Sequence, residues 1–375
     1  MKSTAGFIDA HSHLRATSLS DHGVAGSCFE EALLRMNAMT GVDPFDDALV
    51  ASGQLLLSGV TGVQVIFHTF GTPDHYFSTL ESAISGLRAS KIRFKLILAI
   101  TDQFEFLPQS SNPPLTLPSF VDVGPRMEPA EFRSLVFRIQ SAFPEIDFGI
   151  APVAPQWCSD AMLKVISELA STGMQIHTHC LESSLQRHWI EESPIQRLAR
   201  FNLLGSKTSL AHAIWLSDEE LALVKSTGTH LVTCPRSNST LKAGRAYVSR
   251  WIAEKINFAI GLDSILAKDS PFEVARISLD ETYALKALTY GGQLATGIDS
   301  QNDGVLWSNL QGGIASEVSI GGERVVSNNE LFNHFEFLAA QARIRSVMIE
   351  ATPDRERRHS ELDLVMERYL REINK

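Results

Sequence analysis

Short apolar runs alternate with helix-like stretches through most of the chain. Several runs are apolar at nearly every position, as in Phe94–Ile100, which is typical of parallel strands that helices cover on both faces. The pattern predicts eight strands, each followed by a polar loop and a helix-like segment: Phe7–His13, Gly62–Phe67, Arg93–Ile100, Ile146–Ala151, Met174–His179, Thr208–His212, His230–Cys234 and Asn257–Leu262. Eight such β/α units indicate an α/β fold of the TIM-type (β/α)8 barrel class.

Two long segments interrupt this rhythm. Arg15–Asp43 follows the first strand, and the proline-rich Thr101–Pro129 follows the third. Loops of this length are usually lids or binding loops, and loops after barrel strands lie on the catalytic face. A rigid covering of the barrel's side is the alternative.

The pattern changes after about residue 300. Gly304–Val326 predicts a few short strands separated by Gly-Gly turns, and the chain reads as helical from Asn329 onward. Arg355–Leu370 combines apolar positions at helical spacing with charges of both signs, which predicts an amphipathic helix packed on the barrel or on a neighbouring subunit. We therefore expect a barrel over residues 1–300, a short β segment over 301–328 and helices over 329–375.

Composition narrows the class of protein. The 375 residues carry a net charge of -10, which disfavours binding to nucleic acid or to anionic membranes. No apolar run is long enough to span a bilayer, and Met1–Gly6 lacks the apolar core of a signal peptide. The four cysteines are scattered without CxxC spacing, as reduced thiols would be. We expect a cytoplasmic enzyme.

Two histidines end the first strand. His11 and His13 lie two residues apart, so both side chains point to the same side of the strand, into the mouth of the barrel. Imidazole is a common ligand for Zn²⁺ and Fe²⁺, although an HxH pair alone is equally compatible with a role outside metal binding.

Further polar residues follow later strands. His179 ends the fifth, and Glu182 follows on the loop, where a carboxyl group could move protons beside a metal without binding it. His177 would point inward one layer deeper, as a packing or supporting residue. His212 ends the sixth strand and Asp263 the eighth. Asp263 alone would read as a helix N-cap. However, five candidate residues lie at strand ends of one barrel, which favours a shared site: His11, His13, His179, His212 and Asp263.

The motifs together resemble the amidohydrolase superfamily, specifically its aminohydrolase branch of guanine, cytosine and adenosine-derivative deaminases and triazine chlorohydrolases. They occur in the family's order: Asp9–His13, His179–Glu182, the histidine in Leu210–Ser217, Cys234–Asn238 and Gly261–Ser264. The resemblance covers roughly residues 7–300.

The resemblance implies roles for these residues. His11, His13, His179 and Asp263 would bind one divalent metal ion, Zn²⁺ or Fe²⁺. His212 would complete the ligand shell or hydrogen-bond the reacting water. Glu182 would protonate a ring nitrogen and then the leaving group, and Asp263 would accept a proton from the water. The fourth strand holds no lysine that could bridge two metals, so a mononuclear site is expected.

Departures from the family concern the substrate. Many relatives carry Pro-His after strand four, whereas this chain has Pro152-Val153. Gln156 or Trp157 could read the ligand instead, with loop packing as the alternative for Trp157. His68 and Asn238 are further candidate substrate contacts, although a lone loop histidine such as His68 is more often merely solvated. His230 opens its strand at the opposite end of the barrel and is expected to be structural.

The small domain is also expected to differ. Relatives usually carry a β-sandwich built from strands before and after the barrel. Because the first barrel strand starts at Phe7, the N-terminal half of that sandwich is predicted to be missing, and 301–328 would be a reduced remnant. The C-terminal helices, or a second subunit in a homodimer, would then cover the exposed surface.

The leading hypothesis is a metal-dependent hydrolase that deaminates a small N-heterocycle, amidine or guanidine. The alternative on the same fold is hydrolysis of a cyclic or acyl amide, or removal of a halide or alkylamine. A non-catalytic binding relative is a remote alternative, because such proteins typically lose metal ligands and none is missing here.

Overall fold

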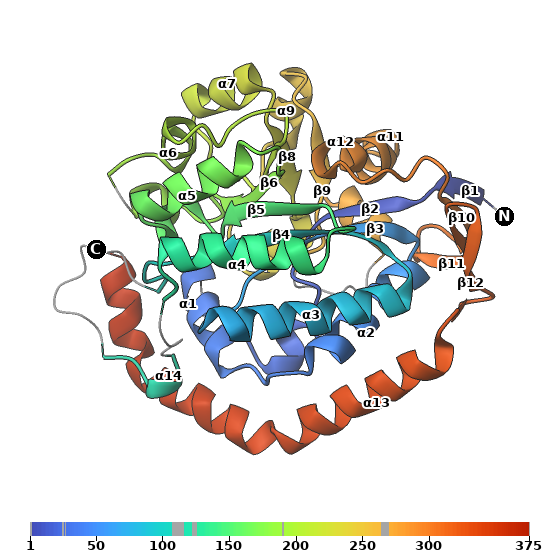
Figure 1. Cartoon of the computed structure of the whole chain (residues 1–375), viewed down its shortest axis with the longest axis horizontal. Helices are drawn as coiled ribbons and strands as arrows, with labels where there is room; N and C mark the ends of the chain where they lie inside the picture. Colours follow the sequence, from blue (N-terminus) through green and yellow to red (C-terminus); the bar gives the residue numbers. More distant parts are fainter. Residues whose placement is uncertain are drawn as a thin grey trace.

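Eight parallel strands form the central barrel in the computed structural model, which describes residues 2–24, 26, 28–106, 116–121, 126–189, 191–263 and 270–374 (Figure 1). The strands are β2 (Phe7–Ser12), β3 (Val60–Phe67), β4 (Arg93–Ile100), β5 (Phe148–Pro152), β6 (Ile176–Cys180), β7 (Thr208–His212), β8 (His230–Thr233) and β9 (Phe258–Ile260). A bridge between Ser12 and Asp263 joins the two ends of the sheet and closes the ring. The (β/α)8 prediction is confirmed, and each predicted strand end lies within two residues of the observed one.

Helices surround the barrel on its outer side (Figure 1). They are α1 (Phe29–Arg35), α2 (Pro44–Leu57), α3 (Pro73–Ser90), α4 (Pro129–Ala142), α5 (Asp160–Ala170), α6 (Pro194–Arg200), α7 (Asp218–Thr227), α8 (Pro235–Thr240), α9 (Val248–Ala253), α10 (Pro271–Arg276), α11 (Glu281–Lys286) and α12 (Gly292–Thr296). Many begin with a side-chain cap followed by proline, as at Asp43-Pro44 and Ser193-Pro194. Such caps satisfy backbone N–H groups that have no partner inside the helix.

Polar side chains fill the barrel interior below the site. The Gln64 amide donates to the carbonyl of Ala10 at 2.9 Å, and the Gln175 amide donates to the carbonyl of Ala295 in α12 at 2.6 Å. The Lys95 ammonium on β4 is bound by Asp147 and by Gln175. Lys95 is therefore held in this lower layer and is not directed to the barrel mouth.

A five-stranded antiparallel sheet lies beside the barrel and corrects one prediction. It consists of β1 (Lys2–Ala5), β10 (Gly304–Asn309), β11 (Ile314–Ile320), β12 (Glu323–Ser327) and β13 (Glu330–Leu331). The expectation that no N-terminal strand joins this sheet is wrong, because β1 pairs with β10 along its whole length. Lys2–Ala5 has no large apolar side chain and is mostly exposed, so its sequence carries no strand signal. The sheet is a reduced form of a sandwich and not two packed sheets.

Two C-terminal helices follow the small sheet and form an arc along one edge of the molecule (Figure 1). α13 (His334–Glu350) packs on α2, where Phe337 lies against Gly53. α14 (Thr352–Ile373) carries the predicted amphipathic run. Its apolar face forms a separate cluster with α1 and the segments on either side of residues 107–115, namely Leu34, Ala38, Phe106, Val121, Leu362, Met366, Tyr369 and Ile373. The helices thus reach the loops at the barrel mouth.

The predicted long segments lie at that mouth as far as they are described. Arg15–Asp43 contains α1, whereas residues 107–115 and 122–125 of the second segment lie outside the described residues, as does Ser264 of the strand-eight motif. Within the described part of the chain, no helix is both long enough and apolar enough to cross a membrane.

Candidate metal centre and active site

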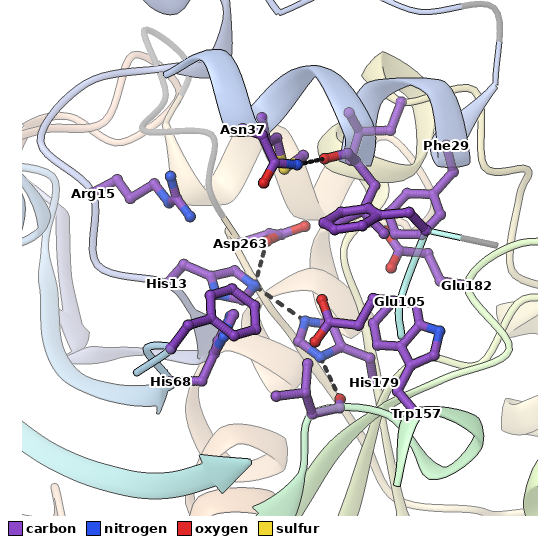
Figure 2. Close-up of a pocket in the computed structure, with 16 residues that line it drawn as sticks. His13, Arg15, Phe29, Asn37, His68, Glu105, Trp157, His179, Glu182 and Asp263 are labelled. Carbon is purple, nitrogen blue, oxygen red and sulfur yellow. Dashed lines mark hydrogen bonds and ion pairs between the residues drawn. The ribbon is translucent and has the colours of Figure 1, made fainter. Parts of the chain in front are cut away.

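Four predicted ligand residues converge at the C-terminal mouth of the barrel. The Nε2 atoms of His13 and His179 lie 3.1 Å apart. The Oδ1 atom of Asp263 lies 3.5 Å from Nε2 of His13 and 3.8 Å from Nε2 of His11. Figure 2 shows His13, His179 and Asp263 pointing toward one another. The strand ends therefore bring together residues that are up to 252 positions apart, from His11 to Asp263.

Hydrogen bonds on the far side of the rings orient these histidines. His179 Nδ1 lies 2.8 Å from the carbonyl oxygen of Val153, so Nδ1 carries the proton and Nε2 presents a lone pair. His11 Nδ1 lies 2.7 Å from Nε2 of His177, whose own Nδ1 lies 2.8 Å from the hydroxyl of Ser209. His177 is thus the supporting residue that its depth predicts. Such partners fix the tautomer of a metal-binding imidazole.

The ring of His212 is also oriented by a hydrogen bond at Nδ1, and the partner is Asn238. His212 Nδ1 lies 2.8 Å from Oδ1 of Asn238, and both side chains are buried. Asn238, predicted as a substrate contact, therefore lies behind His212, and it is not among the described residues that line the cavity. The Nε2 atoms of His11 and His212 have no hydrogen-bond partner within the described part of the chain.

The backbone at the strand ends adopts conformations that non-glycine residues seldom take. Asp263 has φ of 62°, His212 has 66°, and Ala213 and Leu181 have 48° and 49°. Such left-handed residues cost roughly 1–3 kcal/mol each and persist where the surroundings hold them. The turn at Asp263 is held by its N–H, which donates to the His11 carbonyl at 2.8 Å. These residues lie where the chain leaves the strands, next to the cluster at the barrel mouth.

Burial sets the protonation of the cluster. It lowers the pKa of His11 and of His13 well below the ordinary value, and the neighbouring His179 lowers both further. It also lowers the pKa of His179 to about 4. Burial would raise the pKa of Asp263, but the surrounding His11 and His212 and the Ser237 hydroxyl bring it below its ordinary value. Neutral imidazoles beside an ionised carboxylate are the protonation states that metal binding needs.

Glu182 lies beside this cluster in a different electrostatic state. It is buried, and burial first, then the charges of Asp263 and Glu30, raise its pKa well above the ordinary value. Its Oε1 lies 3.6 Å from Nδ1 of His212. The neighbouring Ser183 hydroxyl donates to Glu30 on α1, which links this loop to α1. A protonated carboxyl group here can donate a proton to a ligand.

Two residues support the site without having been assigned a role from sequence. Oδ1 of Asp9 accepts from the backbone N–H of Leu262 at 2.8 Å and of His11 at 3.2 Å, which ties β2 to the segment after β9. Burial raises the pKa of Asp9 to about 8. The Ser237 hydroxyl donates to Oδ2 of Asp263. The motifs contain both residues, but only the fold reveals which atoms they hold.

A cavity of about 180 Å³ opens directly above the cluster. Its described lining includes His13, His179, Glu182 and Asp263 together with a largely apolar wall. The remaining lining residues are Arg15, Phe29, Leu33, Met36, Asn37, His68, Phe70, Glu105, Phe106, Val153, Trp157 and Leu241 (Figure 2). Both long segments therefore contribute to a binding cavity. An apolar pocket with a few convergent polar groups is the usual form of a small-molecule site.

The predicted substrate contacts divide into two groups. His68 and Trp157 line the cavity, whereas Gln156 is buried but is not among its described lining residues. Arg15, Asn37 and Glu105 line it without having been predicted. Arg15 follows His13 at the same two-residue spacing, which is a usable signal, but Glu105 lies in an irregular loop with none. His230 lies away from the site, with Nε2 at 3.1 Å from the carbonyl oxygen of Ser206.

The donor set fits a divalent metal ion. His11, His13 and His179 form one group whose ligand atoms all lie within 4.8 Å of one another, and Glu182, His212 and Asp263 form another. Zn–N bonds of about 2.0–2.1 Å place neighbouring ligand atoms roughly 3 Å apart, close to the spacing of the His13 and His179 nitrogens. Imidazole and carboxylate together suit Zn²⁺ or Fe²⁺.

Fold and site together define a (β/α)8 barrel protein with a cluster of histidines and an aspartate at the C-terminal ends of its strands. The family model of the amidohydrolase family matches residues 3–302, and the chain belongs to that family.

Curated relatives are similar over part of their length. A 5-methylthioadenosine/S-adenosylhomocysteine deaminase of Teredinibacter turnerae is 27% identical over 304 residues, which is 78% of this chain and 61% of the relative. A 5-methylthioadenosine/S-adenosylhomocysteine deaminase 2 of Archaeoglobus fulgidus is 35% identical over 119 residues, 30% of this chain and 29% of the relative. The chain thus matches less than two thirds of the length of either relative.

Solved structures share the fold. A zinc-bound adenosine deaminase from Xanthomonas campestris has a TM-score of 0.70 at 20% identity, over 92% of this chain and 85% of that one. Zinc-bound atrazine chlorohydrolase from Arthrobacter aurescens has a TM-score of 0.70 at 16% identity, over 91% of this chain and 88% of that one.

Proposed function

We propose that the protein is a metal-dependent deaminase of a small amino-substituted N-heterocycle, amidine or guanidine. His11, His13, His179 and Asp263 would hold one divalent cation, Zn²⁺ or Fe²⁺, which when bound would lower the pKa of water toward neutrality and so make a nucleophile available at neutral pH. The curated deaminases similar to this chain support the reaction class.

The protein's own residues divide the remaining work. Asp263 accepts a proton from the attacking water, and the buried Glu182 donates its proton to the ring nitrogen next to the reacting carbon. The ionised Glu182 then takes the hydroxyl proton of the adduct and passes it to the leaving amine, and the proton held by Asp263 restores Glu182. His212, held by Asn238 through Nδ1, keeps its Nε2 directed into the site. The apolar wall of the cavity excludes bulk water and strengthens these interactions.

The observation that carries this proposal is the position of Glu182. A buried carboxyl group with a raised pKa lies in the same cavity as His13, His179 and Asp263. Adding water to an aromatic C–N carbon requires a proton on the adjacent nitrogen, and this is the acid placed to supply it.

Ammonia release tests the proposal. The zinc- or iron-loaded protein is assayed across purines, pyrimidines, pterins, triazines and guanidino compounds that carry an amino group. We expect release from at least one class, and at least a 10²-fold loss of turnover in Glu182→Gln with the metal content unchanged. No release from any compound by metal-loaded protein would overturn the deaminase assignment.

We further propose that the enzyme works in the cytoplasm as a homodimer. Buried free thiols at Cys158, Cys180 and Cys234 suit a reducing compartment. Exposed apolar side chains on α13, among them Phe335 and Ile349, support a second copy as their partner. Light scattering of the purified protein tests the dimer, and a monomer at micromolar concentration would contradict it.

A further inference from the structure

Glu105 is a buried carboxylate in the cavity that the proposed chemistry does not use. It follows β4, is 4% exposed, and lines the cavity together with His13 and His179. Figure 2 shows its carboxylate among the side chains of the cavity, between His68 and Trp157.

The Glu105 carboxylate is incompletely hydrogen-bonded. Within the described part of the chain its Oε1 has no hydrogen-bond partner. Nη1 of Arg126 lies 4.0 Å from this oxygen, which is too long for a hydrogen bond. The Arg126 guanidinium lies over the ring of Phe70, with 5.0 Å to the centroid. Burial raises the pKa of Glu105 to about 7, while Arg126 and the Thr101 side chain act in the opposite direction.

An acceptor of this kind requires a donor from elsewhere. A buried acceptor without a hydrogen bond is unfavourable, and nearly all such groups in folded proteins have a partner. The cation in the described lining, Arg15, already has anionic neighbours, because the charges of Asp47 and Asp263 raise its pKa against the effect of burial. Among the carboxyl groups of the described lining, Glu182 and Asp263 already have roles in the proposed chemistry, which leaves Glu105 to recognise a ligand.

The cavity walls limit what can bring that donor. Apolar side chains, among them Phe29, Trp157 and Leu241, line the cavity along with the metal-ligand cluster and Glu105. Flat aromatic walls suit a planar ring. A cavity of about 180 Å³ is smaller than the roughly 300 Å³ or more typical of drug-sized ligands, which favours a single small heterocycle over a ligand with a large substituent.

We propose that Glu105 determines the substrate class: its Oε1 accepts a hydrogen bond from a second amino group on the heterocycle, away from the amino group that leaves. The substrate is then a small diamino-substituted ring. This inference rests on the proposed deaminase function for the identity of the leaving group, but the recognition step is a binding event that can be measured by itself.

The test compares two ligands that differ only in the second amino group. Zinc-loaded Glu182→Gln protein, which is expected not to turn the ligands over, is titrated by calorimetry with 2,4-diaminopyrimidine and with 4-aminopyrimidine. At pH 8, above the pKa of about 7, Glu105 is mostly ionised, and we expect the diamine to bind about tenfold more tightly because a hydrogen bond to a charged acceptor is among the stronger kinds. Adding Glu105→Ala should bring the two dissociation constants to within about twofold of each other.

Matched variants separate recognition from a structural ion pair. Arg126→Ala removes the cation near Glu105 but keeps the acceptor, so the preference for the diamine should remain. Glu105→Gln keeps the shape and should lower the preference by severalfold, and it serves as the test if Glu105→Ala does not fold. Zinc content and thermal melting of each variant establish that the site is intact.

Defined results overturn the inference. The inference fails if Glu182→Gln protein binds the two pyrimidines with equal affinity or binds neither at millimolar concentration. It also fails if the preference for the diamine survives both Glu105→Ala and Glu105→Gln. A further result would also overturn the inference: 5'-deoxyadenosine binding depends on Glu105, but diamine binding does not. Glu105 would then accept hydrogen bonds from sugar hydroxyls. This test and the test of function can fail separately. Ammonia release without a Glu105-dependent preference would keep the deaminase assignment and remove this role of Glu105. A Glu105-dependent preference without ammonia release would keep the recognition role and remove the deaminase assignment.

Discussion

The Nε2 atoms of His13 and His179 face each other at 3.1 Å, with the two rings nearly parallel at 15°. Because His179 donates from Nδ1 to Val153, its Nε2 presents a lone pair to His13. Two buried imidazole nitrogens at this distance are best satisfied by a shared cation, and the carboxylate of Asp263 at 3.5 Å from His13 adds the negative charge that a divalent ion requires.

Replacing His13 should abolish metal binding. Zinc at a hundred times its dissociation constant should stabilise the metal-free wild type by about 2.7 kcal/mol, an increase in melting temperature of several degrees. His13→Ala should show no such increase and well under one equivalent of zinc by elemental analysis. His230→Ala, at the opposite end of the barrel, is the control and should still respond to zinc. An equal response in His13→Ala would remove His13 from the site.

His177 should influence metal affinity through His11. Loss of a supporting hydrogen bond to a metal-binding histidine typically costs 10–100-fold in affinity, because the imidazole loses its fixed tautomer and orientation. His177→Leu should therefore weaken zinc binding by that factor in competition with a chelator. His177→Gln retains an acceptor for Nδ1 of His11 and should recover part of the affinity. Equal affinities in the two variants would contradict this role.

The apolar face of α14 should contribute strongly to stability. Leu362 is fully buried against α1 and the segment containing Phe106, whereas Leu364 on the same helix is 86% exposed. Leu362→Ala should lower the free energy of unfolding by roughly 2–5 kcal/mol, and Leu364→Ala by less than about 0.5 kcal/mol. Urea denaturation measures both. Similar losses in the two variants would mean that α14 does not pack as described.

His22 should make stability depend on pH. Its Nδ1 accepts from the backbone N–H of Thr40 at 3.2 Å, so the fold requires the neutral ring, and burial lowers its pKa from 6.5 to about 4. Because the folded-state pKa lies below the unfolded one, the contribution is full above pH 6.5 and falls as the pH drops from 6.5 toward 4. The decrease in melting temperature between pH 7 and pH 5 should be smaller in His22→Gln than in the wild type. An identical decrease would exclude His22 from this effect.

Much of the fold, and the cluster of histidines and Asp263 at the barrel mouth, could be predicted from the sequence because both depend on strand periodicity. Continuous apolar runs locate the barrel strands, and polar residues where those runs end, such as His179 and Asp263, must meet at the mouth. β1 could not be predicted, because a short edge strand is held by backbone hydrogen bonds rather than by buried side chains.

The supporting residues were harder to assign for a related reason. Asn238 lies in a recognisable motif, but whether its amide faces the ligand or the far side of His212 depends on how α8 packs, which no local spacing encodes. Glu105 lies in an irregular loop whose position is set by contacts with distant parts of the chain, among them α14.

The bridge between Ser12 and Asp263 joins the beginning of the barrel to its end, and Asp263, a proposed metal ligand, lies at this junction. Ser12 lies between His11 and His13 in the sequence, and its partner across the bridge is Asp263. Contacts this distant in sequence form slowly, because the entropy of the intervening chain must be lost first. The proposed ligand set is therefore complete only when the last strand docks, so a nascent chain that still lacks β9 has the three histidines but not the aspartate of the proposed site.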